Sequence, residues 1–255
     1  MIIGVQTYTI RDFIRGENQI QTAFQKLRTI GYRTIQACSF EEIRPERLRE
    51  LADENGIQMI SSAISHIKLR EETDQVIKEC QILGCKHVSI GSFPHEYVAG
   101  GWNGVQAFFR DFTLVAEKLA TVGMKFHCHN HYYEFERFDG KSLMEWMLQE
   151  TDPKLWGMVL DVYWVQYAGK NPATMIRKLK GRIDICHIKD MAVRNRELQT
   201  VPVMEGNLDW QDILSACEET GVPYAMVEQD DTYGKDPFDE LKISYDHLKN
   251  SGMQF

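Results

Sequence analysis

Three histidines stand at every second position of residues 126–131, and this segment has the clearest capacity for chemistry in the chain. They are His127, His129 and His131, three of the eight histidines present. A period of two is the repeat of a β-strand, so the spacing predicts three imidazoles on one face of a strand. One such histidine alone is readily explained as a core side chain hydrogen-bonded to the backbone. Three on one face crowd each other when protonated, and each neutral ring needs a partner, which favours a metal ion or a polar substrate.

The composition limits the classes of protein to which the chain can belong. Its 255 residues are 43% hydrophobic and 26% charged, which suits one large or two small globular domains. The formal net charge of −8 disfavours a nucleic-acid partner. The amino terminus has no basic signal sequence, and no apolar run approaches the roughly 18 residues of a membrane helix. Six scattered cysteines without a Cys-x-x-Cys pair are typical of a reduced protein, so we expect a cytoplasmic protein with no membrane partner.

Segments with strand-like and helix-like patterns alternate along the whole chain. The expected strands cover residues 2–8, 34–37, 57–64, 86–90, 126–131, 157–161, 183–188 and 224–228. The expected helices cover 17–30, 42–55, 71–83, a segment from the end of a 92–103 loop to about 121, 141–150, 172–180, 210–220 and 237–249. Eight strand–helix pairs in this length predict a parallel (β/α)8 TIM barrel, an α/β fold forming a single domain over residues 1–255. A doubly wound open sheet is the alternative, but no glycine-rich phosphate loop follows the first strand.

In a barrel of this kind, the carboxyl ends of the strands meet at one rim and form the site. The fifth to eighth strands end in His129, Asp161, His187 and Glu228, which are all of metal-ligand type. Imidazole and carboxylate together suit Mn²⁺, Fe²⁺, Co²⁺ or Zn²⁺ better than Mg²⁺ alone. Each residue taken singly also has a simpler explanation, as a turn cap, a core histidine or an ion-pair partner. It is their joint placement on consecutive strands that favours a metal site.

Six segments, spread in order over nearly the whole chain, carry a family resemblance. They are GVQTYTIRD (4–12), HNHYYEF (129–135), LDVYW (160–164), HIKDM (187–191), EGNLDW (205–210) and VEQD (227–230). Together they resemble the xylose isomerase-like TIM-barrel superfamily, the group of sugar phosphate isomerases and epimerases. The resemblance implies one divalent metal ion (Mn, Zn, Co, Fe or Mg) on His129, Asp161, His187 and Glu228. It also implies a small-molecule carbohydrate substrate and assembly into homodimers or homotetramers.

Two positions depart from better-known members of that superfamily. His129 stands where epimerases carry a glutamate, often in a Glu-Asn-His run, and Trp164 stands where DNA-repair relatives carry the histidine of an Asp-x-x-His pair. The first departure removes the pair of glutamates that serve as acid and base on the two faces of a ketose. The second, with the acidic net charge, weakens a phosphodiester-cleaving function.

These observations lead to a mechanistic hypothesis with three outcomes. Glu228 or His131 moves a proton next to a metal-polarised carbonyl, and an enediolate forms; Glu134 is a further candidate for this role. Lys189 hydrogen-bonds the substrate or neutralises the developing charge. The candidates for substrate contact are Gln6, His66, Trp164 and Lys189. Reprotonation gives an isomerase or epimerase of a sugar, keto-sugar or sugar phosphate. Expulsion of a β-substituent gives a lyase or dehydratase of a keto-sugar or keto-inositol, and a barrel that only binds sugar is the third hypothesis.

Overall fold

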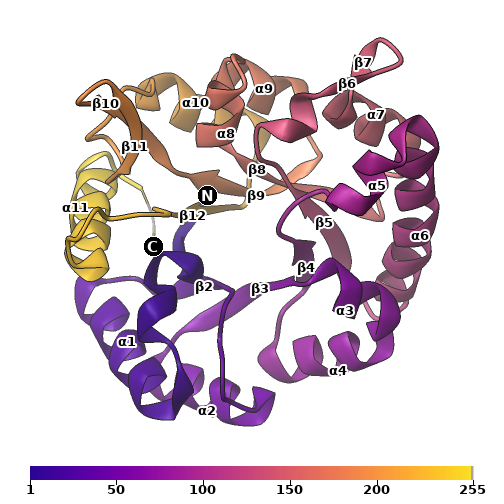
Figure 1. The fold of residues 1–255 in the computed structure, drawn as a ribbon. Helices are drawn as coiled ribbons and strands as arrows, with labels where there is room; N and C mark the ends of the chain where they lie inside the picture. Colours follow the sequence, from indigo (N-terminus) through magenta and orange to yellow (C-terminus); the bar gives the residue numbers. More distant parts are fainter. Residues whose placement is uncertain (254) are drawn as a thin grey trace.

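Eight parallel strands close into a barrel, the inner ring of the computed structural model in Figure 1. The structure describes residues 1–253 and 255. In spatial order the strands are β1, β12, β9, β8, β5, β4, β3 and β2. Their bounds are Ile2–Gln6 (β1), Thr34–Ala37 (β2), Gln58–Ile64 (β3), His87–Ile90 (β4), Lys125–His129 (β5), Trp156–Asp161 (β8), Ile183–Ile188 (β9) and Tyr224–Val227 (β12). The TIM barrel predicted from the sequence is therefore confirmed.

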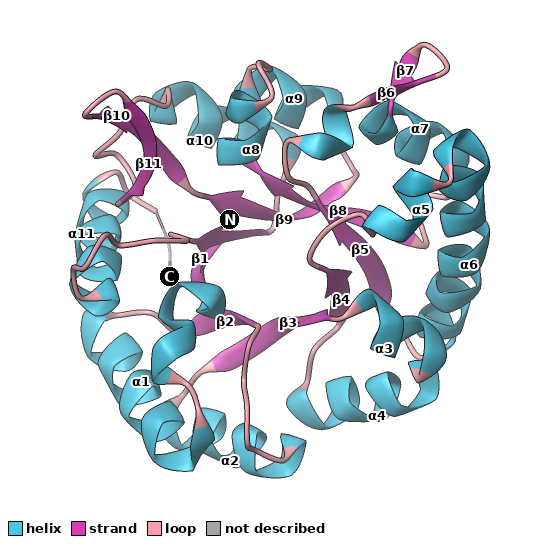
Figure 2. Ribbon diagram, in the orientation of Figure 1, coloured by secondary structure: helices cyan, strands magenta, loops and turns pink. Residues whose placement is uncertain are grey.

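Helices surround the barrel on its outer side, as Figure 2 shows in cyan. Their bounds are Gly16–Ile30 (α1), Pro45–Asn55 (α2), His66–Glu71 (α3), Thr73–Leu83 (α4), His95–Ala99 (α5), Gly101–Thr121 (α6), Leu143–Glu150 (α7), Val162–Tyr167 (α8), Pro172–Lys178 (α9), Trp210–Thr220 (α10) and Pro237–Asn250 (α11), with 3₁₀ turns at Thr7–Phe13 (η1) and Tyr133–Phe135 (η2). Among the residues that the structure describes, no helix has both the length and the apolar character that crossing a membrane requires.

The main hydrophobic core lies between the strands and the helices. Helix α6 directs Val105, Phe108 and Phe112 inward at helical spacing, and all three are fully buried. The Trp156 ring of β8 packs edge-on against Phe126 of β5, with ring centroids 4.7 Å apart. Burying each of these large side chains contributes about 1.5–3 kcal/mol. A strand that packs against other groups on both faces is buried along its whole length. The sequence of β8 is therefore an apolar run that ends in one carboxylate.

A second, smaller apolar cluster fills the inside of the barrel. Ile60, Val159, Ile185 and Met226 pack together there, each less than 5% exposed. Three of them lie two residues before Asp161, His187 and Glu228, so side chains of the same strand face stack in layers. The candidate site therefore rests on a water-excluding apolar floor.

Four segments differ from the expectations from sequence. The helix expected over 71–83 is preceded by a separate helix, α3, and the loop expected over 92–103 contains α5 and the start of α6. An antiparallel hairpin lies between the expected strand 183–188 and the expected helix 210–220, where no strand was predicted. The small strands are Arg137–Phe138 (β6), Lys141–Ser142 (β7), Asp190–Arg194 (β10) and Glu197–Val201 (β11). The β10–β11 turn has positive φ angles at Asn195 and Arg196, and this pair lacks the glycine that usually marks such turns.

The histidine strand is shorter than predicted. Strand β5 ends at His129, so His131 lies beyond the strand, although its ring still lies 4.8 Å from that of His129. The His131 amide donates to Glu134 Oε2 at 2.7 Å, which replaces the strand ladder at this point. The structure thus places His127 against Asp184, away from the contact that His129 makes with Asp161, while His129 and His131 stay together.

Candidate active site

Four side chains from the carboxyl ends of β5, β8, β9 and β12 converge above the apolar floor. They are His129, Asp161, His187 and Glu228, and each offers one ligand atom within 4.8 Å of the others. Asp161 Oδ2 lies 3.4 Å from His129 Nε2 and 3.9 Å from His187 Nδ1. Glu228 Oε2 lies 2.9 Å from His187 Nδ1. All four are less than 10% exposed, so the structure brings together the predicted ligand set in a buried position.

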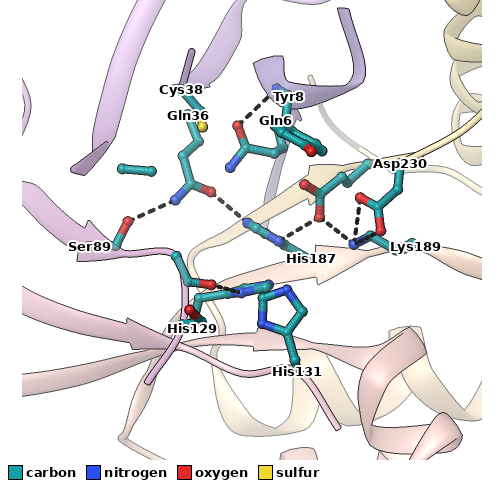
Figure 3. Close-up of a pocket in the computed structure, with 14 residues that line it drawn as sticks. Gln6, Tyr8, Gln36, Cys38, Ser89, His129, His131, His187, Lys189 and Asp230 are labelled. Carbon is teal, nitrogen blue, oxygen red and sulfur yellow. Dashed lines mark hydrogen bonds and ion pairs between the residues drawn. The ribbon is translucent and has the colours of Figure 1, made fainter. Parts of the chain in front are cut away.

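Hydrogen bonds on the far side of each imidazole determine which ring nitrogen faces the cluster. His129 Nδ1 donates to the Gly91 carbonyl oxygen at 2.8 Å, which leaves Nε2 toward Asp161. His187 Nε2 donates to Gln36 Oε1 at 2.6 Å, which leaves Nδ1 toward Glu228. Gln36 Nε2 in turn donates to Ser89 Oγ at 3.2 Å, as the dashed lines in Figure 3 show. Both rings therefore turn their second nitrogen toward carboxylate oxygens, an arrangement that either a proton on the ring or a metal ion between the groups would satisfy.

The donor set fits one divalent metal ion. Among the described residues, His187 Nδ1 and Glu228 Oε2 are buried without a correctly aligned hydrogen-bond partner, although they approach to 2.9 Å. Buried polar atoms of this kind are costly unless something satisfies them. Two imidazole nitrogens and two carboxylate oxygens are the donors that Zn²⁺, Co²⁺, Fe²⁺ and Mn²⁺ accept readily.

Asp161 serves the site and the backbone at the same time. Its Oδ1 accepts hydrogen bonds from the amides of Tyr163 and Trp164 at 2.9 and 3.3 Å, capping α8. Its Oδ2 faces the histidines. The Asp161 amide donates to Asn130 Oδ1 at 3.0 Å, which ties the end of β8 to the segment after β5. The capping explanation and the ligand explanation are therefore compatible, because they use different oxygens.

Lys189 is a buried cation beside the ligand carboxylates. Its Nζ lies 2.9 Å from Asp161 Oδ2, 2.8 Å from Glu228 Oε2 and 3.0 Å from Asp230, and its side chain is 2% exposed. Burial alone would lower the pKa of Lys189, but the three carboxylates raise it above its usual value. Only Asp230 Oδ2 accepts a hydrogen bond from Nζ, at 3.0 Å, and the other two contacts are ion pairs. Lys189 thus pairs with the carboxylates and also lines the cavity described below, so the substrate contact predicted for it stays a prediction.

The charges around the cluster explain its other pKa shifts. Burial alone would raise the pKa of Glu228, but Lys189 and then His187 outweigh it and lower the pKa well below its usual range. For Asp161 burial is again opposed by Lys189, and the net pKa is lowered. Burial and the nearby Glu228 raise the pKa of Asp230 to about 6. Glu228 and Asp161 are therefore anions at neutral pH, as metal ligands and a general base must be.

A cavity of about 420 Å³ opens directly onto the ligand cluster. This volume lies within the range of small-molecule sites. The residues that line it are Gln6, Tyr8, Gln36, Cys38, Ala63, Ser89, Gly91, Ser92, His129, His131, His187, Lys189, Glu228 and Asp230. The predicted contact Gln6 is among them, and so is His131, whose ring lies 4.8 Å from that of His129. Burial lowers the pKa of His131 to about 3, so the ring is neutral at physiological pH.

Four predicted site residues do not line this cavity. One of them, Asp161, is fully buried within the ligand cluster. Glu134 is fully buried and accepts from the amides of Phe93 and His131 at 2.9 and 2.7 Å, so it holds loops together and the predicted acid–base role is not supported. His66 pairs with Glu96 on the surface at 2.6 Å. Trp164 packs behind His131, with ring centroids 5.2 Å apart.

The cavity also contains residues that were not predicted from the sequence. They are Tyr8, Gln36, Cys38, Ala63, Ser89, Gly91 and Ser92, from β1 to β4 and the segments after them. Small, neutral side chains on early strands carry no motif that distinguishes them from ordinary strand residues. Gln36 was inconspicuous in sequence, although it lies on β2 and contacts His187, 151 residues away.

Comparison with known proteins agrees with the fold. The sequence profile of the family described as "Xylose isomerase-like TIM barrel" matches residues 24–251, so the chain belongs to this family. The resemblance inferred from the motifs is thereby confirmed. No curated protein sequence matches the chain.

Solved structures share the barrel at low sequence identity. A sugar phosphate isomerase/epimerase from Parabacteroides distasonis is 21% identical over 97% of both chains, with a TM-score of 0.83. A D-psicose 3-epimerase from Clostridium cellulolyticum, solved with D-tagatose, is 13% identical over 98% of this chain and 99% of its own, with a TM-score of 0.72. A probable 3-DHS dehydratase from Bacillus anthracis is 15% identical over 98% and 99%, with a TM-score of 0.71. At these identities the likeness shows the fold alone.

Proposed function

We propose that this protein is a divalent-metal-dependent isomerase or epimerase that acts on a sugar or keto-sugar, with or without a phosphate, through an enediolate. The observation that carries the proposal is the convergence of two imidazole lone pairs and two carboxylates beside an open polar cavity. Enzymes with these functions among the structural neighbours, a sugar phosphate isomerase/epimerase and a D-psicose 3-epimerase, are consistent with it.

The chain's own residues have distinct roles in this proposal. A divalent ion held by His129, Asp161, His187 and Glu228 would act as a Lewis acid toward a carbonyl group. Among the described residues, the close contacts of Glu228 fall on Oε2, which leaves Oε1 to accept a proton from carbon. Lys189 holds the carboxylates of Asp161 and Glu228 in position. The remaining cavity residues orient the hydroxyl groups of the substrate.

We expect asymmetric chemistry with Glu228 as the base. Glu134 points its oxygens at backbone amides. Asp230, the other carboxylate that lines the cavity beside Glu228, is paired with Lys189, so neither is placed as the second base of a symmetric two-base epimerase. One base can remove a proton from one carbon and return it to the neighbouring carbon, which is an aldose–ketose isomerisation. The same geometry favours the second candidate, a lyase, in which the deprotonated intermediate expels a β-substituent instead of being reprotonated.

The first experiment measures metal content by mass spectrometry and deuterium uptake from D₂O into keto-sugars. We expect about one divalent ion per chain in the wild type, and loss of that ion in His187→Ala. Glu228→Gln should lower deuterium uptake at least ~100-fold because it removes the base. Asp231→Asn, on the same loop but outside the cavity, is the matched control and should retain the wild-type rate.

The products distinguish the three hypotheses. Deuterium in a recovered ketose or aldose supports the isomerase or epimerase, and a new enone absorbance supports the lyase. Sugar binding with neither change leaves a binding barrel. A near-wild-type rate in Glu228→Gln contradicts the assignment of the base, and absence of metal after reloading contradicts the metal-dependent mechanism.

A further inference from the structure

One lysine lines the cavity, and carboxylate groups already surround its ammonium. Among the described residues that line the cavity, Lys189 is the sole lysine or arginine. Its ammonium lies within 3.0 Å of carboxylate oxygens from Asp161, Glu228 and Asp230. These carboxylates surround the ammonium as ion-pair partners, and Asp230 Oδ2 also accepts a hydrogen bond from Nζ at 3.0 Å. Among the described residues that line the cavity, no side-chain cation is therefore free of carboxylate partners to bind a phosphate group.

The total charge of the site leads to the same conclusion. Three carboxylates and one ammonium give two net negative charges, which one divalent ion would neutralise. Proteins that recognise a phosphate monoester concentrate positive charge, usually from arginine or lysine, around it. This site offers a sugar phosphate no such excess. Asp230, whose side chain is 33% exposed, would instead repel it.

The rest of the lining is suited to hydroxyl groups. Gln6, Ser89 and Ser92 contribute neutral donors and acceptors, and Tyr8 adds an aromatic ring. Figure 3 shows Gln6, Tyr8 and Ser89 around the cavity that faces His187 and Lys189. Neutral amides and hydroxyls hydrogen-bond the hydroxyl groups of a polyol without needing a charged partner.

The nearest arginine of the adjoining η1 segment is also engaged. Arg11 donates from Nη1 to the Tyr8 carbonyl oxygen at 3.0 Å, and its guanidinium lies 4.3 Å from the centroid of the Tyr8 ring. It does not line the cavity. Its other N–H donors could still reach a phosphate at the mouth of the cavity, and Arg11→Ala provides a direct test of that alternative.

We infer that the substrate of this site is an uncharged carbohydrate, a free sugar, keto-sugar or keto-polyol, and that phosphorylated sugars are rejected. The inference rests on the proposed function and narrows it. It separates this chain from the sugar phosphate enzymes that share its fold.

The test compares matched pairs of ligands on the metal-loaded protein. D-fructose is paired with D-fructose 6-phosphate, and D-ribulose with D-ribulose 5-phosphate, and binding is measured by ligand-observed NMR alongside deuterium exchange. We expect each phosphorylated sugar to bind at least about tenfold more weakly than its free partner. Equal or tighter binding of the phosphorylated sugars, particularly if Arg11→Ala abolishes it, overturns the inference even when exchange supports the proposed function. Free-sugar binding without exchange overturns the proposed function alone, and absence of binding in every pair overturns both.

A charge variant provides a second, independent test. Asp230→Asn removes one negative charge and releases one N–H of Lys189, so it should shift the binding ratio toward the phosphorylated sugar by about threefold to tenfold. Asp231→Asn removes the same charge from the neighbouring residue, which does not line the cavity, and should leave the ratio unchanged. Identical shifts in the two variants would show that the cavity charge does not set the preference.

Discussion

Replacing Gln36 with leucine should weaken metal binding although Gln36 touches no metal-ligand carboxylate. Gln36 Oε1 accepts the hydrogen bond from His187 Nε2 at 2.6 Å, and this bond directs Nδ1 to the cluster. Gln36 is 1% exposed and His187 is 2% exposed, so bulk water cannot easily replace the lost acceptor. In Gln36→Leu, the ring is free to rotate, and its N–H is left without a partner.

The expected loss is tenfold to 100-fold in metal affinity. Removing a partner that orients a metal-bound histidine typically costs about that factor. It corresponds to about 1.4–2.7 kcal/mol. Ser89→Ala removes only the acceptor for Gln36 Nε2, at 3.2 Å, and should cost less, about fivefold or below. Gln36→Glu keeps an oxygen acceptor at the same position and should retain the wild-type affinity to within about threefold.

Competition titration of Co²⁺ against a chromophoric chelator measures the affinity, and the visible Co²⁺ spectrum reports the ligand set. Circular dichroism and urea unfolding check that the variants remain folded. If Gln36→Leu binds Co²⁺ as tightly as the wild type and with the same spectrum, the hydrogen bond does not orient His187. A loss of similar size in Gln36→Glu would show that side-chain volume, and not the acceptor, is what matters.

Two further predictions concern the amino-terminal end of the barrel. Burial lowers the pKa of His87 to about 4. The unfolded chain therefore binds this proton more readily, and the free energy of unfolding should fall as pH decreases from about 6.5 toward 4. Urea unfolding of the metal-free protein should show a loss of up to about 2 kcal/mol between pH 8 and pH 5 that is reduced in His87→Phe, and parallel pH profiles would contradict this assignment. A Cβ at Gly157 would lie 2.4 Å from Asp184 Oδ2 and 2.5 Å from the His127 ring, so Gly157→Ala should destabilise the protein by about 1–3 kcal/mol. At Gly91 a Cβ meets no atom within 4 Å, so Gly91→Ala is the control, and equal unfolding midpoints for the two variants would refute the steric argument.

The fold and the clustering of the four candidate ligands could be predicted from the sequence for the same physical reason. Parallel strands bury both faces and therefore stand out as short apolar runs between amphipathic helices. Their carboxyl ends must meet at one rim of a closed barrel. The sequence therefore predicted that strand-end residues such as Asp161, His187 and Glu228 lie close together. The same reasoning overestimated β5 by two residues, because the side chain of Glu134 takes over the hydrogen bond at His131.

Only the tertiary structure decided what each polar side chain contacts. Glu134 and His66 had suitable chemistry and suitable positions in sequence, yet one binds backbone amides and the other binds Glu96. Gln36 had no motif, yet it accepts a hydrogen bond from His187, 151 residues away. The hydrophobic periodicity determines where a strand lies and which face is buried, since it reflects a local and repeated pattern. The direction of a single amide, carboxylate or imidazole depends on the few partners within hydrogen-bonding distance, and those come from distant parts of the chain.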